Sequence, residues 1–115
     1  KTGITVASAT KGSIDEVPLS LWGQLLPVIK ECLTNAVRHG QATYIHFEAE
    51  VGVDVKGRHL IIRIKDNGHG KANYKPGNGI QGMKERLAAL GGELKIEPGQ
   101  GYLVEMRLSI SGIQQ

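Results

Sequence analysis

The chain has 115 residues and a mass of 12.4 kDa, the size of one domain. Hydrophobic residues make up 40% and charged residues 22%, as in soluble globular proteins, and the formal net charge of +3 is too small to demand a nucleic-acid or membrane partner. A single cysteine, Cys32, excludes an internal disulfide framework and a metal site built on several cysteines.

Residues 4–10 alternate loosely between polar and apolar side chains and include β-branched residues, which predicts an edge strand. Apolar residues then recur at helical spacing from Ser20 to His39, with Ser20 as the predicted N-cap and Gly40 as the residue after the last turn. Pro27 fits poorly inside this helix, so the sequence predicts either a bend there or a later start.

The rest of the chain predicts a hairpin, a glycine-rich loop, a second helix and a final pair of strands. In order, these are strands over 43–53 and 59–65, a loop over 66–82, a helix over about 80–90, and strands over 93–98 and 102–110. This order predicts an α+β fold, a two-layer α/β sandwich with both helices packed on one face of a mixed, mainly antiparallel sheet. Because helices and strands do not strictly alternate, a doubly wound parallel sheet is not expected.

Four polar residues gather at the end of the first helix. At about 100° per residue, Glu31, Asn35 and Arg38 return to one side of the helix, and His39 flanks them. A solvated face would explain them, because amphipathic helices commonly have one. A carboxylate and an amide oxygen are also hard ligands that suit Mg²⁺, and the Arg and His one turn on can meet phosphate oxygens.

The glycine-rich loop contains two motifs, DNGHG over 66–70 and GNGIQGM over 77–83. Each alone can be an ordinary turn. Together they place glycine N–H groups at a helix N-terminus, which is a site for anions, and a fixed Asp66 carboxylate that can accept from an exocyclic amine such as that of adenine. Neither the GxxxxGK[ST] phosphate loop nor the dinucleotide-binding fingerprint fits this stretch.

Three motifs therefore stand in order along the chain: Glu31-xxx-Asn35-xx-Arg38-His39, Asp66-x-Gly68-x-Gly70 and Gly77-x-Gly79-Ile80-x-Gly82-Met83. In this order they resemble the catalytic and ATP-binding domain of bacterial sensor histidine kinases, within the superfamily of gyrase-type, mismatch-repair and heat-shock chaperone ATPases that share the Bergerat-type ATP-binding fold. The stretch from Gly79 to Gly101 resembles the subgroup related to nitrate sensors and the membrane-fluidity sensor kinase. The resemblance makes residues 1–115 one such domain, a fragment of a longer protein.

The resemblance implies a role for each motif residue. Asn35 would coordinate Mg²⁺ between the phosphates, and Glu31 would orient a metal-bound water or act as a base. Arg38 and His39 would contact phosphate, and Asp66 would bond the adenine amino group. The residues that would shape the adenine pocket, approach the phosphates or form the lid hinge are Gly68, Gly70, Gly77, Gly79, Ile80, Gly82 and Met83.

One residue departs from the family pattern. The family usually has Gly-Thr near the start of the last strand, with the threonine hydroxyl close to the adenine-binding aspartate. Here Tyr102 follows Gly101, so the threonine contact to the base is missing or is supplied by water.

The implied reaction transfers the γ-phosphoryl of ATP to a histidine on a separate helical dimerisation domain, and from there to a response regulator. None of the four histidines of the chain fits that acceptor, so the isolated domain is expected to bind ATP without phosphorylating itself and to be monomeric. The resemblance also implies a cytoplasmic domain, with the plasma membrane as one location of the full-length protein. Two alternatives stay open: a serine kinase of the anti-sigma-factor type, and a nucleic-acid-binding module, which the small and scattered charge disfavours.

Overall fold

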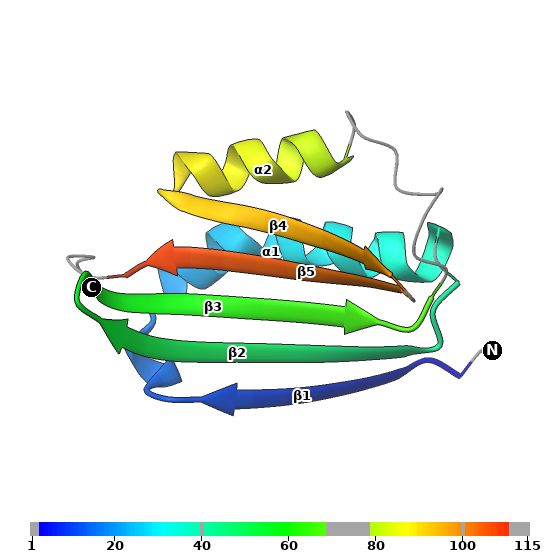
Figure 1. The fold of residues 1–115 in the computed structure, drawn as a ribbon, viewed down its shortest axis with the longest axis horizontal. Helices are drawn as coiled ribbons and strands as arrows, with labels where there is room; N and C mark the ends of the chain where they lie inside the picture. The colour runs from blue at the N-terminus through cyan, green and yellow to red at the C-terminus, as the bar shows by residue number, and fades with distance from the viewer. Residues whose placement is uncertain (1–2, 40, 69–78, 100, 111–115) are drawn as a thin grey trace.

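The computed structural model describes residues 3–39, 41–68, 79–99 and 101–110, which form one sheet and its covering helices (Figure 1). The elements are β1 (Thr5–Lys11), η1 (Ile14–Glu16), α1 (Leu19–Thr34), η2 (Asn35–His39), β2 (Tyr44–Asp54), β3 (Gly57–Asp66), α2 (Gly79–Ala89), β4 (Gly92–Gly99) and β5 (Gly101–Ser109). The five strands run in the order β1-β2-β3-β5-β4, with β1 parallel to β2 and every other pair antiparallel. The predicted two-layer α+β sandwich is confirmed, and β1 is an edge strand as expected.

The first helix begins earlier than the sequence predicts. Pro18 is its N-cap, in an extended conformation, and the N–H groups of Leu21 and Trp22 donate to the Pro18 carbonyl. Ser20 therefore lies inside the first turn, and its prediction as N-cap is wrong. Pro27 is also inside α1, where its ring nitrogen has no hydrogen to donate to the preceding turn. The predicted later start is thus wrong as well.

The last turn of this helix is not α-helical. From Asn35 to His39 the chain forms the π-helix η2, in which N–H groups bond five residues back rather than four. The spacing of about 100° per residue therefore applies from Glu31 to Asn35 but not through the π turn, and a face shared by Glu31, Asn35 and Arg38 stays a prediction. Gly40, the expected end residue, lies outside the described residues.

The core lies between the helices and the inner face of the sheet. Its fully buried side chains include Leu25 of α1, Leu87 of α2 and Ile62 of β3. Burying each such side chain contributes about 1.5–3 kcal/mol to folding. Cys32 is a small buried residue of α1, whereas Trp22 packs against the core while partly exposed.

The outer face of the sheet carries charges of alternating sign. Across one row of the register, Glu48 of β2 faces Arg63 of β3, which faces Glu105 of β5, and that residue faces Lys95 of β4. Arg63 lies 3.9 Å from Glu48 and 3.7 Å from Glu105. Beside this row, Ile61 is only 8% exposed although it points away from the helices. Across the described part of the chain, neither helix combines the length and hydropathy that crossing a bilayer requires.

Candidate functional site

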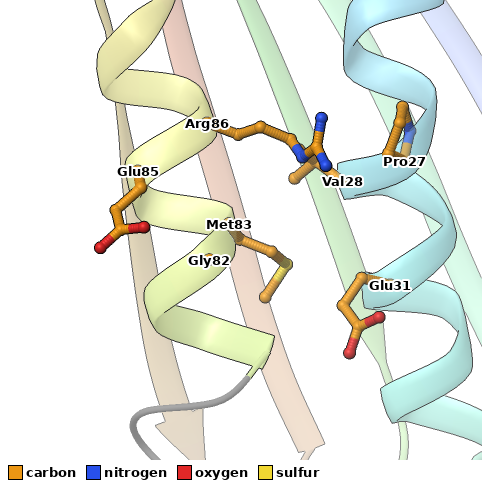
Figure 2. Close-up of a pocket in the computed structure, with 7 residues that line it drawn as sticks. All are labelled: Pro27, Val28, Glu31, Gly82, Met83, Glu85 and Arg86. Atoms are coloured by element: carbon orange, nitrogen blue, oxygen red, sulfur yellow. The ribbon is translucent and has the colours of Figure 1, made fainter.

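The two helices form a groove that holds part of the predicted site. It has a volume of about 580 Å³ and is lined by Pro27, Val28, Glu31, Gly82, Met83, Glu85 and Arg86. Figure 2 shows Glu31 and Met83 projecting into the space between the helices, while Arg86 reaches from α2 toward α1. Three predicted site residues from motifs about fifty positions apart, Glu31, Gly82 and Met83, thus share one groove.

A sulfur contact joins the two helices at this groove. The Sγ atom of Cys32 donates to the Sδ atom of Met83 at 3.6 Å, and both side chains are buried. Burial, with a smaller contribution from the neighbouring Glu31 carboxylate, raises the pKa of the Cys32 thiol from its ordinary 9.0 to about 12. The thiol therefore stays protonated at neutral pH. Its place is structural, because it fixes Met83 at the start of α2 against α1.

Asn35 stands where α1 passes into η2. Its N–H donates to the carbonyls of Glu31 and Cys32, and its side chain is only 8% exposed. An amide at the surface of an amphipathic helix would be solvated, so the interpretation of Asn35 as part of an ordinary wet face is wrong. Arg38, in the following π turn, is exposed. Exposure leaves its guanidinium accessible to an anion.

Asp66 is the last residue of β3, and it is only 5% exposed. Its Oδ1 atom accepts from the N–H of Gly68 at 2.8 Å and from the N–H of Tyr102 at 3.4 Å. Two backbone donors thus hold one oxygen of the carboxylate in place. The aspartate is positioned as a fixed acceptor at the end of the strand, as the sequence predicts.

The start of β5 packs directly against this aspartate. Gly101 has φ +95°, and a Cβ atom there would stand 2.0 Å from the carbonyl oxygen of Asp66. The buried Tyr102 follows it, beside Asp66 on the inner face of the sheet and outside the main hydrophobic cluster. Burial raises the pKa of the Tyr102 hydroxyl, and the Asp66 charge adds to that rise. The tyrosine therefore stands next to the carboxylate, at the position where the resemblance led us to expect threonine.

The two halves of the predicted site lie at the same end of the molecule. In Figure 1 the ends of α1 and β3, the start of β2 and the start of α2 all lie toward the same side of the fold. The N–H of Ala42 donates to the carbonyl of Ala36 at 2.9 Å, and the N–H of Asn67 donates to the carbonyl of Tyr44 at 3.2 Å. The segment after Asn35 is thereby joined to the strand end that carries Asp66.

For several predicted site residues the structure describes only part of the residue or none of it. Gly70 and Gly77 lie outside the described residues, as do the side chains of His39 and Ile80. Gly79 is the first residue of α2. Their roles at a ligand stay predictions.

The sequence did not single out Asn67. Its only signal was the Asn-Gly pair of an ordinary turn. In the structure its side chain bonds to the start of β2, at Thr43 and Tyr44.

The donor set of Glu31 and Asn35 fits Mg²⁺ delivered with a phosphate ligand. Mg²⁺ typically uses one or two carboxylates with water and substrate phosphates, rather than a complete protein cage. Among the described side chains, no group of three or more His, Cys, Asp or Glu is placed to hold a metal by itself. One carboxylate and one amide are what a nucleotide-borne ion would need from the protein.

Comparisons with known proteins agree with this geometry. Residues 23–112 match the family described as histidine kinase-, DNA gyrase B-, and HSP90-like ATPase. The sensor histidine kinase LnrJ of Bacillus subtilis strain 168 is 33% identical over 111 residues, which are 95% of this chain and 27% of LnrJ. The sensor histidine kinase YdfH of the same strain is 36% identical over 95 residues, 76% of this chain and 23% of YdfH. The chain thus spans about a quarter of these relatives.

Solved structures share the fold. A blue-light activated histidine kinase of Erythrobacter litoralis EL346 superposes with a TM-score of 0.74 at 23% identity, over 98% of this chain and 37% of that one. The ATP binding domain of PrrB from Mycobacterium tuberculosis gives a TM-score of 0.69 at 20% identity, over 92% of this chain and 79% of that one. Because the family model matches residues 23–112, most of its length, the chain belongs to the family of histidine kinase-, DNA gyrase B- and HSP90-like ATPases.

Proposed function

We propose that the chain binds ATP with Mg²⁺ and donates the γ-phosphoryl group to a histidine on a separate helical domain of a sensor histidine kinase. One observation supports this most. Among the described residues, Asn35 and Asp66 are the two side chains of polar or charged type that are buried, and both occupy motif positions. Asn and Asp side chains are mostly exposed in folded proteins, so the burial of both at motif positions favours a ligand site over an ordinary turn and a solvated helix face.

In this proposal Asp66 recognises the base. Its Oδ1 atom is held by backbone N–H groups, so we assign Oδ2 to the exocyclic amine of adenine. Tyr102 borders the same carboxylate and limits the space beside it.

The phosphate end is assigned to the helix side of the site. Asn35 and Glu31 would hold Mg²⁺ or its water, Arg38 would meet phosphate oxygens, and Gly82 would approach them through its backbone. The ion would neutralise charge on the phosphates. Phosphoryl transfer depends mainly on positioning and charge neutralisation, and these residues contribute both.

The acceptor is proposed to lie outside this chain. His46 and His59 are half-buried strand residues, and the Nδ1 atom of His59 lies 3.6 Å from Asp54 at the hairpin turn. Neither has the helical setting expected of an acceptor. The names of the relatives favour a histidine over a serine as the acceptor. Incubation of the isolated domain with labelled ATP is expected to leave the protein unlabelled, and label on the chain would contradict this assignment.

Calorimetric titration with a non-hydrolysable ATP analogue tests the base assignment. We expect micromolar or weaker binding, with Asp66→Asn reducing affinity about tenfold or more, because a hydrogen bond to a charged group contributes about 1.5–3 kcal/mol. Asn35→Ala is expected to reduce Mg²⁺-dependent transfer more than base recognition. Glu105→Gln, on the outer face of the sheet, is the control. Equal affinity in the Asp66→Asn and Glu105→Gln variants would remove Asp66 from the base pocket.

A further inference from the structure

The side chain of Asn67 bonds two segments that are far apart in the sequence. Its Oδ1 atom accepts from the N–H groups of Thr43 and Tyr44, both at 3.0 Å, and its Nδ2 atom donates to Oγ1 of Thr43 at 3.1 Å. The N–H of Asn67 also donates to the carbonyl of Tyr44 at 3.2 Å. These four bonds close the end of the β2–β3 pairing, immediately after Asp66.

The partner segment leads back to the other half of the site. Ala42, just before Thr43, donates its N–H to the carbonyl of Ala36, which follows Asn35 in η2. Thr43 in turn accepts from the N–H of Thr5 at 2.9 Å, which fixes it to the start of β1. A short path of hydrogen bonds and peptide units therefore runs from the π turn to the strand end that holds Asp66.

We infer that Asn67 is a positioning residue for the nucleotide site. It sets the strand end that presents the Asp66 carboxylate relative to the π turn that presents Asn35. The inference rests on the proposed function. Asn67 touches no ligand in this account, and it acts through its neighbour on the chain.

Two features of the site make this position sensitive. Asp66 is confined on its other side by Gly101, where no Cβ atom fits, and by the N–H of Tyr102. The N–H of Gly68, which follows Asn67 directly, holds Oδ1 of Asp66 at 2.8 Å. Without the three side-chain bonds of Asn67, only the bond from its N–H to the Tyr44 carbonyl ties the turn that carries this donor to the start of β2. The Gly68 N–H then holds the Asp66 carboxylate less firmly in its orientation.

The alternative is that Asn67 only stabilises the turn. The two roles differ in a measurable way, because a structural role changes the unfolding transition but does not change which base the folded protein prefers. The measurement is the ratio of dissociation constants for purine riboside triphosphate, which lacks the 6-amino group, and ATP. It is made well below the unfolding midpoint of each variant.

We expect a ratio of about ten or more for the wild type, because only ATP offers the amine that Asp66 accepts. Asn67→Ala is expected to lower the ratio to about three or less. Lys65→Ala, an exposed change on the other side of Asp66, is expected to keep the wild-type ratio. A wild-type ratio in Asn67→Ala would overturn the inference, whereas a ratio near one in the wild type would instead refute the base assignment itself.

A second pair of variants keeps the test decisive if Asn67→Ala does not fold. Thr43→Val removes the Oγ1 acceptor and leaves both backbone donors, and Thr43→Ser keeps the hydroxyl. We expect the ratio to fall about two- to threefold in Thr43→Val and to stay unchanged in Thr43→Ser. Equal ratios in the two variants would count against the positioning role.

Discussion

At position 101 glycine is required by the close approach of a neighbouring residue, Asp66, as well as by its own backbone conformation. The φ of +95° at Gly101 alone strains any residue with a side chain, and the carbonyl oxygen of Asp66 occupies the space that a Cβ atom would need. Gly91 also has positive φ, at +79°, but nothing lies within 4 Å of the place of its Cβ atom. The close approach at Gly101 lets the N–H of Tyr102 reach the carboxylate of Asp66.

Gly82 offers a test of the phosphate assignment. Among the described residues outside its own helical turn, none has an atom within 4 Å of the place of its Cβ atom, and the same is true of Gly23 in α1. Both Gly82→Ala and Gly23→Ala are expected to stabilise the protein by about 0.5–1 kcal/mol in urea unfolding, because alanine favours helix. Only Gly82→Ala is expected to weaken ATP binding, by about tenfold, since the added methyl group would stand where the phosphates approach. Equal ATP affinities in the two variants would place the phosphates elsewhere.

At the scale of elements, α1 combines two irregular features. Pro27 interrupts its hydrogen-bond ladder in the middle, and the π turn of η2 ends it. π turns inside helices occur frequently at functional sites, where the extra residue redirects side chains. Here the change of geometry begins at Asn35, whose buried side chain marks the point where the proposed metal site begins.

Replacing the proline should stabilise the helix. Pro27→Ala restores an N–H that can donate to the carbonyl of Gly23, and both residues are exposed. We expect an increase of about 1–3 kcal/mol in the free energy of unfolding, up to the cost of proline in a helix interior. Urea unfolding of the two proteins measures this difference. An unchanged midpoint would mean that the helix is already distorted enough to absorb the proline.

The elements could be predicted from the sequence where periodicity is local. The apolar alternation of β2, β3 and β5 and the helical spacing of α1 gave their type and order. The start of α1 at Leu19 could not be predicted, because Pro18 supplies a backbone acceptor in place of a side-chain cap. The π turn could not be predicted either, because an α turn and a π turn can be built from the same residue types.

At the scale of the whole molecule, the site depends on how helices and sheet are joined. Asn35, Asp66 and Met83 come from separate elements, and only the tertiary fold brings them to one end. The sequence supplied these residues through the resemblance of their motifs. It could not supply the Asn67 bonds, which join positions 24 residues apart through side-chain geometry.

The buried thiol between the helices makes global stability depend on pH. The pKa of Cys32 is about 12 in the folded protein against an ordinary 9.0. The contribution of the buried, protonated thiol to the free energy of unfolding is therefore complete below pH 9 and is lost as the pH rises toward 12. Between pH 8 and 10 the loss should be about 1.4 kcal/mol. Cys32→Ala is expected to be less stable at pH 7, because it leaves a small cavity, but its stability should fall less steeply over this range.

Urea unfolding at pH 8, 9 and 10 measures both slopes. Other titrating groups, Tyr102 among them, are present in both proteins and cancel in the comparison. Parallel pH profiles of the free energy of unfolding for the wild type and Cys32→Ala would contradict the assignment of this pH dependence to the buried thiol.

The uncovered side of the sheet has a consequence for large polyanions. Among the described residues, its charged side chains are Lys11, Glu48, Glu50, Asp54, Arg63, Lys65, Glu93, Lys95, Glu97, Glu105 and Arg107. Six carboxylates and five cations are interleaved there, so their fields largely cancel within about the 8–10 Å over which salt screens them. The excess positive charge of the chain therefore lies elsewhere, and this broad surface offers a DNA or RNA backbone no net attraction.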